Sequence, residues 1–398
     1  MKNKIFKLQG KVQHYAWGGC EFIPQLLGFE NLQKKPCAEY WMGAHPSASG
    51  KLETEDGLQE WYNLIQQEPV GHLGKQVWEQ FGELPYLLKV LDVREMLSIQ
   101  VHPTKDEASK GYEREHAKGI AITASHRNYK DKNHKPEVMI ALGDFWLLHG
   151  FKKEEALQQV LDLVPEFSFL SKIFADGGYY ELYKAVMEMP REEADELLLS
   201  LVEREITTPH TKEEPGYWVA KLYNGVLPAS NIDKGIFSIY FFNIVHVKEG
   251  EAVFQGAGVP HAYLEGQNIE LMANSDNVLR GGLTLKHIDV PELLKHIVFE
   301  GIEPNILTGE VLTSGEIAYP LPVQDFGIST IKLENGREYV SKSKSTEIFL
   351  VMQGEANCDE ITCKKGEAFV VLANEAYTIR GIENVVLYKA FVPLQEKD

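Results

Sequence analysis

One stretch of the chain, residues 88–103, constrains the fold more than any other. It is a largely apolar run that indicates a strand, and it ends at Pro103, which cannot donate to a ladder of backbone hydrogen bonds. Residues two apart in a strand project from the same face. Gln100 and His102 therefore point the same way, with Ser98 behind them, and they offer a carbonyl oxygen and a ring nitrogen side by side.

Two further stretches offer metal-binding side chains. Glu137 follows His-Lys-Pro and opens an apolar run that indicates another strand, and His261 follows a glycine-rich turn. With Gln100 and His102 they make a set of two imidazoles, one carboxylate and one amide oxygen. Such a set suits Zn²⁺ and, less selectively, Fe²⁺ or Mn²⁺. On residue types alone the alternative stays open that His102 and His261 are hydrogen-bonded turn residues.

Longer phrases of the sequence carry a resemblance to a known family. They are residues 14–18 (HYAWG), 38–46 (AEYWMGAHP), 98–103 (SIQVHP), 134–137 (HKPE), 259–263 (VPHAY) and 274–284 (NSDNVLRGGLT). In content and order these phrases resemble the signatures of the type I mannose-6-phosphate isomerases. The similarity spans residue 13 to about residue 286, and beyond it the match is one of general layout.

The resemblance implies an activity and a set of site residues. It implies a zinc-dependent aldose–ketose isomerase that interconverts D-mannose 6-phosphate and D-fructose 6-phosphate through an enediolate, in carbohydrate metabolism leading to GDP-mannose biosynthesis. One Zn²⁺ per chain would be held by Gln100, His102, Glu137 and His261. Mapped phrase by phrase, the catalytic residues would be Arg280, Lys286 and Glu270, and the substrate-binding residues would be Trp17, Lys89, Ser98, Lys135 and Asp276.

The physical chemistry of these residue types fits that reaction. Zn²⁺ paired with one carboxylate keeps about one net positive charge, which can polarise a carbonyl and stabilise an enediolate. Arg280 adds a forked donor for an oxyanion or a phosphate. The group that moves the proton is left open among Glu270, Asp276, Lys135, Lys286 and a metal-bound water. Leu285 stands where the family commonly has proline.

The pattern of elements predicts a fold that is mainly β with an all-α insertion. Residues 154–164, 179–189 and 191–205 have helical periodicity, and strands are expected to resume at residues 236–241. Two strand–glycine turn–strand units, at residues 245–254 and 347–372, are typical of cupin barrels. We therefore expect duplicated cupin (jelly-roll) β-barrels plus a helical domain. The second unit has no metal-binding phrase.

The expected domain boundaries follow from this pattern. Residues 1–150 and 229–320 would form the catalytic cupin (jelly-roll) domain, residues 151–228 the helical insertion domain, and residues 321–398 a C-terminal jelly-roll domain without metal.

Composition limits the kinds of binding partner and the cellular compartment to be expected for this chain. The formal net charge of −18 disfavours nucleic acid, so a phosphate would need a local cluster of Lys and Arg. No apolar run is long enough to cross a bilayer, and the N-terminus lacks the apolar core of a signal peptide. The four cysteines have no CxxC spacing and are expected to be free thiols. We expect a cytoplasmic monomer whose partner is a hexose 6-phosphate.

Two other functions remain as alternatives. A cupin oxygenase would use Fe²⁺ with two histidines and one carboxylate, and Gln100, Arg280 and Lys286 argue against it. A non-catalytic sugar-phosphate-binding regulator would retain the ligands without turnover, and nothing in the sequence indicates such a loss.

Overall fold

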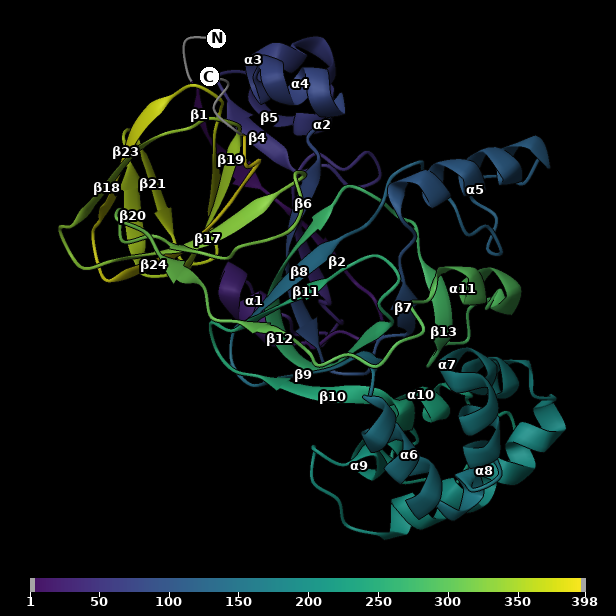
Figure 1. Cartoon of the computed structure of the whole chain (residues 1–398). Coiled ribbons are helices and arrows are strands. Elements are labelled where there is room, and N and C mark those ends of the chain that lie inside the picture. The colour runs from purple at the N-terminus through teal and green to yellow at the C-terminus, as the bar shows by residue number, and fades with distance from the viewer. Residues whose placement is uncertain (1–3, 395–398) are drawn as a thin grey trace.

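A computed structural model describes residues 4–394, a mixed fold of helices and antiparallel sheets (Figure 1). Within these residues the strands form three sheets. The first sheet runs, from edge to edge, β15 (Glu310–Val311), β16 (Ile317–Ala318), β17 (Gly327–Leu333), β24 (Val385–Phe391), β19 (Glu347–Gln353), β22 (Ala368–Val371), β1 (Ile5–Gln9), β4 (Lys51–Thr54) and β5 (Gly57–Glu60).

The second sheet carries the predicted ligand residues. Its main path is β14 (Ile306–Leu307), β11 (Ala252–Gln255), β8 (Glu137–Ala141), β12 (His261–Ala273), β6 (Tyr86–Val93), β3 (Glu39–Met42) and β2 (Lys11–Gln13). Off this path, β9 (Phe145–Phe151) pairs with β12 and β10 (Phe242–Val247), and β7 (Ile99–Val101) pairs with β12 and β13 (Leu279–Gly282). The third sheet is β18 (Glu338–Lys342), β23 (Ala376–Gly381), β20 (Glu355–Cys358) and β21 (Ile361–Lys364).

Helices occur in three places along the chain. Near the N-terminus are α1 (Phe22–Leu27), α2 (Trp61–Gln67), α3 (Pro69–Leu73), α4 (Lys75–Phe81) and α5 (Lys105–Ala117). The central helices are α6 (Glu154–Leu163), the short 3₁₀ helix η1 (Pro165–Phe167), α7 (Leu170–Glu188), α8 (Arg191–Thr207), α9 (Pro215–Leu222) and α10 (Gly235–Phe241), and α11 (Val290–His296) follows later. Helices outside residues 151–228 make the fold more mixed than the mainly β prediction.

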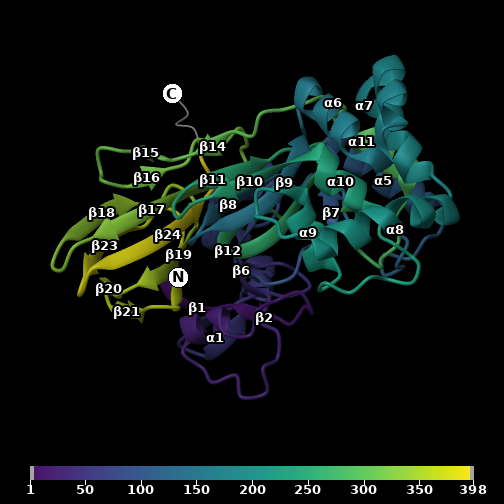
Figure 2. The ribbon, with the colours of Figure 1, turned by 90° about the horizontal axis from the view of Figure 1, so that it is seen from below.

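The central helices and the third sheet lie at opposite ends of the molecule (Figures 1 and 2). The helices predicted at residues 154–164, 179–189 and 191–205 are confirmed. In α7 the backbone is non-helical at Gly178, where φ is 64°. The part of α7 after this residue therefore begins where the helical periodicity of the sequence begins. In α8 the periodicity corresponds to one buried side, because Leu198, Leu201 and Val202 are fully buried.

The strand predicted at residues 236–241 is wrong: these residues lie in α10, and the strand β10 begins only at Phe242. All seven residues of α10 are buried. Since α10 is covered on every side, its apolar residues show neither a period of two nor one of 3.6, and a short apolar run of this kind cannot be told from a strand.

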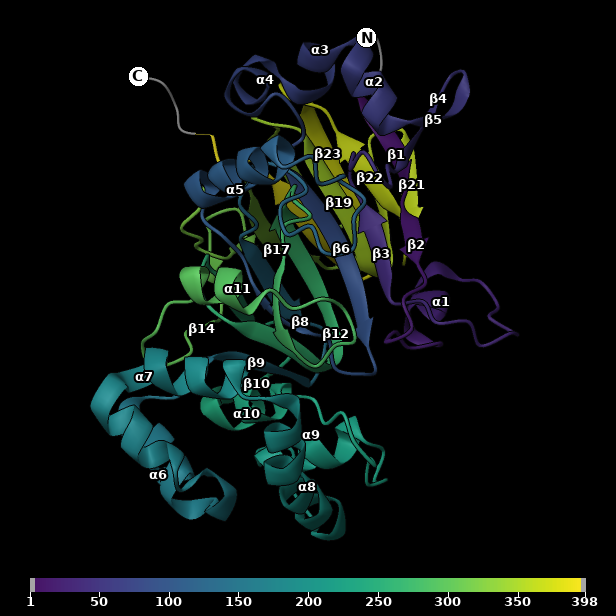
Figure 3. The ribbon, with the colours of Figure 1, turned by 90° about the vertical axis from the view of Figure 1, so that its right-hand side faces the viewer.

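Alternate residues along the strands of the second sheet point into two different hydrophobic cores. We define the inner core as Leu91, Val93, Met139, Ala141, Phe145, Leu147, Val245, Val247, Val253 and Tyr263. Their strand neighbours on the opposite face, such as Val90 and Ile140, pack instead with Ile348 and Val370 of the first sheet. The opposite face of β9, including Leu148, packs against the central helices. The second sheet therefore curves around the inner core and is covered outside by the first sheet and the helices (Figure 3).

The first sheet joins the two ends of the described chain. Strand β1 pairs with β22 and with β4, so residues near the N-terminus complete a sheet that is otherwise built from strands after residue 306.

Two sequence predictions, that the cysteines are free thiols and that no apolar run crosses a bilayer, can be compared with the structure of the described residues. The four cysteines are unpaired, as predicted. No helix between residues 4 and 394 has the length and apolar character that crossing a bilayer requires.

Candidate metal centre and cleft

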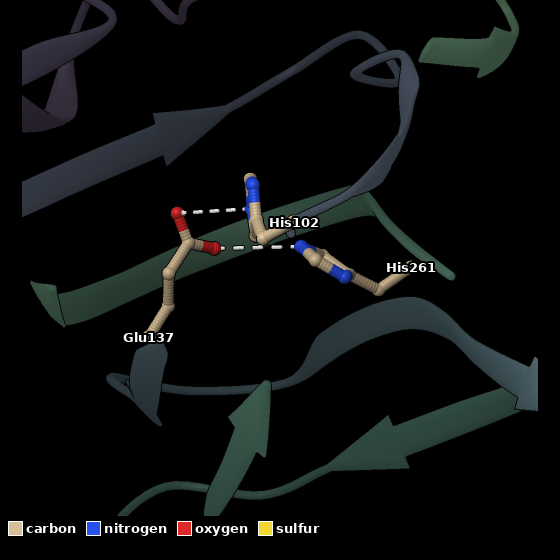
Figure 4. Close-up of side chains that lie close together, drawn as sticks. All are labelled: His102, Glu137 and His261. Carbon is tan, nitrogen blue, oxygen red and sulfur yellow. Dashed lines mark ion pairs between the residues drawn. The ribbon is translucent and has the colours of Figure 1, made fainter. Parts of the chain in front are cut away.

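Three of the four predicted ligands converge beside the inner core. His102 Nε2 lies 3.5 Å from Glu137 Oε1, and His261 Nε2 lies 3.4 Å from Glu137 Oε2 (Figure 4). One ligand atom from each residue lies within 4.8 Å of the other two. All three side chains are buried, so the group is a compact donor set shielded from bulk water.

The hydrogen bonds of the two histidines leave the correct nitrogens free for a metal. His102 Nδ1 lies 2.9 Å from the carbonyl oxygen of Asn277, and His261 Nδ1 lies 2.9 Å from that of Val259. Since a carbonyl only accepts, each Nδ1 donates and each Nε2 carries a lone pair. Both Nε2 atoms are buried and have no hydrogen-bond partner in the described chain. Burial also lowers the pKa of His102 to about 4, which keeps the ring neutral, as a metal ligand must be.

Glu137 stays ionised in this buried position chiefly because the Lys135 ammonium lies beside it. Burial by itself would raise the pKa of the Glu137 carboxyl, but Lys135 and His102 hold it well below its usual range. The Lys135 ammonium lies 2.9 Å from Glu137 Oε1. Two neutral imidazoles and one carboxylate are the donors of catalytic zinc sites, so the residues present fit Zn²⁺.

Gln100, the fourth predicted ligand, lies on the strand beside His261. In β7 it is directly opposite His261 of β12 on one side and Arg280 of β13 on the other. Its neighbours Ile99 and Val101 face the core under the central helices, so the Gln100 side chain faces the other way, with His102. The placement agrees with a ligand role, which stays a prediction.

The metal-binding group adjoins a cleft of about 510 Å³ through Gln100 and Lys135. Every predicted substrate-binding residue lines this cleft, and so do two of the three predicted catalytic residues. These cleft-lining residues are Trp17, Lys89, Ser98, Lys135, Asp276, Arg280 and Lys286. Glu270, the third predicted catalytic residue, does not line the cleft, and it lies buried next to Lys89.

Arg280 and Lys286 form the basic side of the cleft. Burial lowers the pKa of Arg280, and burial together with Arg280 and Lys130 lowers the pKa of Lys286. Arg280 Nε is buried without a hydrogen-bond partner in the described chain. These cations are crowded together, which favours binding of an anion among them.

The loop that carries Lys286 is held by Asp233, which precedes α10. The Asp233 carboxylate accepts the backbone N–H groups of Gly235 at 2.7 Å, Leu283 at 2.9 Å and Thr284 at 2.9 Å. Leu283 has a φ of 54°, a left-handed conformation that costs a branched residue free energy. The two bonds from Leu283 and Thr284 to Asp233 offset that cost and fix the loop against the start of α10.

A buried ionic cluster adjoins the cleft through Lys89 and Glu39. Lys89 Nζ is 2.9 Å from Glu270 Oε2 and 3.5 Å from Glu39 Oε2, and Trp41 Nε1 donates to Glu39. Burial alone would lower the pKa of Lys89, but the carboxylates of Glu270 and Glu39 raise it above its usual value. Burial and the neighbouring carboxylates raise the pKa of Glu270, which Lys89 only partly offsets. Glu270 thus binds a proton more readily than an exposed glutamate.

Several other cleft residues were not predicted as site residues, among them Tyr15, Glu39, Trp41, His45 and Lys130. The sequence contained a sign that three of them belong to the site. Glu39, Trp41 and His45 lie in the phrase at residues 38–46 that carries the family resemblance, and Glu39 and Trp41 are two apart in one strand. The amide of Ser47 donates to His45 Nδ1 at 3.2 Å, and His45 Nε2 lies 3.7 Å from Asp276 Oδ2.

Fold and site together define a class of protein. Among residues 4–394, a buried metal-binding group of two histidines and a glutamate adjoins a cleft lined by several lysines and Arg280, which suits a metal-dependent enzyme of small anionic substrates.

Comparisons with known proteins then give the family. Residues 5–154 match the model of the phosphomannose isomerase type I catalytic domain. Over 387 residues the chain is 38% identical to the mannose-6-phosphate isomerase of Escherichia coli K12, covering 94% of this chain and 97% of that one. The human mannose-6-phosphate isomerase is 32% identical over 429 residues, 97% of this chain and 98% of the human one. The chain belongs to the type I mannose-6-phosphate isomerase family.

Solved structures agree with this assignment. The mannose 6-phosphate isomerase of Salmonella typhimurium bound to fructose 6-phosphate and zinc superposes with a TM-score of 0.88 at 33% identity, covering 98% of this chain and all of that one. A zinc-bound holo structure of mannose 6-phosphate isomerase gives the same TM-score and identity.

Proposed function

We propose that the chain interconverts D-mannose 6-phosphate and D-fructose 6-phosphate with one bound Zn²⁺. The observation that carries the proposal is the buried His102–Glu137–His261 group with both Nε2 atoms free, next to a cleft lined by the predicted substrate residues. Membership of the isomerase family supports the choice of substrate, and the zinc- and fructose 6-phosphate-bound relative supports the choice of metal.

The proposed ligands are His102, Glu137, His261 and Gln100. When bound, Zn²⁺ supplies a Lewis acid for the substrate oxygens. Lys135 helps to keep Glu137 ionised, and the carbonyls of Asn277 and Val259 keep the two rings in the orientation that presents Nε2. Metal-binding histidines are commonly fixed by such a bond at their other nitrogen.

The proton transfer between the two sugar carbons is assigned to Glu270. Of the open candidates it is the carboxyl whose pKa is raised, which suits a group that must both take and return a proton. Lys89 is bonded to Glu270 and lines the cleft, so it would link that buried carboxyl to the substrate.

Arg280 is assigned to the oxygens that become negative in the enediolate. Its guanidinium presents several donors in a fixed fork and carries a permanent charge. Lys286, Lys135 and Ser98 would bind the phosphate, and Asp276 and Trp17 would position the sugar.

The architecture that we propose keeps the boundaries predicted from the sequence. The second sheet around the inner core would be the metal-binding cupin jelly roll, helices α6 to α9 the insertion at residues 151–228, and the strands after residue 321 the jelly roll without metal. Supporting this, β17 to β24 pair mainly with each other, and β1, β4 and β5 link them to the N-terminal part. Residues 1–3 and 395–398 of these ranges lie outside the described residues.

A coupled isomerase assay with metal analysis tests the function. Purified protein should contain about one Zn²⁺ per chain and convert each hexose phosphate into the other, and a chelator should abolish turnover. Oxygen consumption with Fe²⁺ and no isomerisation would identify an oxygenase instead, and tight binding of hexose 6-phosphate without turnover would identify a regulator. Cytoplasmic location, a monomeric state and a role in GDP-mannose biosynthesis stay predictions.

A further inference from the structure

Two buried polar side chains lie beside the metal-binding group and have no role in the proposed chemistry. His149 in β9 is directly opposite His261 in β12, and Gln255 in β11 is directly opposite Glu137 in β8. Opposite residues of an antiparallel pair project from the same face, about 5 Å apart at Cβ. Each of these side chains is therefore the immediate neighbour of a ligand.

The alternation along both strands confirms the face. Leu147, two residues before His149, and Val253, two residues before Gln255, both belong to the inner core. Met139, two residues after Glu137, and Tyr263, two residues after His261, belong to it as well. His149 and Gln255 thus lie in the same layer as the ligands His261 and Glu137, next to the inner core.

Both side chains carry polar groups that the protein does not satisfy. His149 is 6% exposed and Gln255 is fully buried. Neither amide atom of Gln255 has a hydrogen-bond partner among residues 4–394, and the ring of His149, which approaches the backbone of Phe254, makes no hydrogen bond of good geometry there. Burying such groups unpaired lowers stability, so a folded chain that keeps two of them beside a ligand set calls for an explanation.

We propose that His149 and Gln255 are positioning residues of the metal centre. The Gln255 amide would donate to the Glu137 carboxylate through a bridging water. His149 would bond in the same way to the donor set beside His261. Bonds of this kind orient the ligands and raise the affinity for the metal. The inference rests on the proposed zinc site and extends it from the ligands to the polar side chains beside them.

The test measures zinc affinity and stability separately. The variants His149→Leu and Gln255→Leu should each weaken Zn²⁺ binding about 10-fold or more, measured by competition with a chromophoric chelator. The metal-free variants should unfold at the same or a higher urea concentration than the metal-free wild type, because leucine removes an unpaired buried polar group. Weaker metal binding with undiminished metal-free stability is a combination that a purely structural role would not give.

Asn268 provides a matched control on the same face of β12. It is fully buried, and neither of its amide atoms has a partner in the described chain. It lies opposite Ala141, four residues along β8 from Glu137 and so about 13 Å away. Asn268→Leu should leave the zinc affinity unchanged.

Unchanged zinc affinity in both variants, as in Asn268→Leu, overturns the inference and leaves the zinc site standing. If a leucine variant does not fold, His149→Gln or Gln255→Met takes its place, and its zinc affinity should fall at least several-fold. A wild-type chain that binds no Zn²⁺ overturns the zinc site itself, and with it this inference.

Discussion

Replacing Lys89 by methionine removes the one cation that lies between two buried carboxylates. Lys89 is 5% exposed, and its ammonium lies 2.9 Å from Glu270 and 3.5 Å from Glu39. At an effective dielectric constant of about 20, each contact represents about 5 kcal/mol of attraction, most of which is offset by taking the charges out of water. Lys89→Met leaves the carboxylates uncompensated, so the free energy of unfolding should fall by about 3–5 kcal/mol at pH 8.

The loss should depend on pH in a defined direction. In the variant the pKa of Glu270, already raised by burial, rises further because Lys89 no longer offsets it. An acid whose pKa is higher in the folded than in the unfolded state loses stability as the pH rises between these two values. The deficit of Lys89→Met against wild type should therefore be largest at pH 8 and should shrink towards pH 5. Adding Glu270→Gln should restore part of the stability at pH 8.

Urea unfolding of the metal-free proteins, followed by circular dichroism at pH 5 and pH 8, measures both effects. Lys75→Met serves as the control, because Lys75 and Glu79 form an exposed pair 3.6 Å apart whose loss should change stability by less than about 0.5 kcal/mol. A deficit of Lys89→Met below about 1 kcal/mol at pH 8, or one that is the same at pH 5, would refute the reasoning.

Three other outcomes are expected. His102→Ala should bind no Zn²⁺ in metal analysis, and retention of stoichiometric zinc would contradict its role as a ligand. Arg280→Ala should keep its zinc and lose about 10²- to 10³-fold in kcat, whereas a near-normal kcat in the coupled assay would remove Arg280 from the mechanism. Burial raises the pKa of Glu83 to about 6, so Glu83→Gln should stabilise the protein by about 1 kcal/mol at pH 8, allowing for partial solvent screening, and by nothing near pH 4.5. Thermal unfolding at the two pH values measures this, and a gain that does not change with pH would contradict it.

The ligand-bearing part of the site could be predicted because its information is local. Gln100 and His102 share a face because they are two apart in a strand that Pro103 ends, and the family resemblance supplied Glu137 and His261. The structure brings His102, Glu137 and His261 together as the sequence predicts. The central helices were also predictable, since α6 and α8 each have one exposed and one buried side and hence a clear period.

The remaining features depend on contacts between distant parts of the chain. The cluster of Lys89, Glu39 and Glu270 exists only because β6 lies between β3 and β12. A lone lysine in a strand gives no sign of two carboxylates opposite it. The helix α10 was missed for the reverse reason, since burial on all sides removes the periodicity on which the assignment depends.

The pairing of β1 with β22 has a consequence for how the protein forms in the cell. Ile5 lies opposite Val371, so during synthesis β1 meets one of its two neighbours only after the whole segment between them has been made. At typical elongation rates that delay is roughly 20–70 s. During it the residues of β1, among them Phe6 and Leu8, which are buried in the finished molecule, lack that neighbour. Until β22 emerges, β1 of a nascent chain therefore has an unpaired edge that a temporary partner strand could cover.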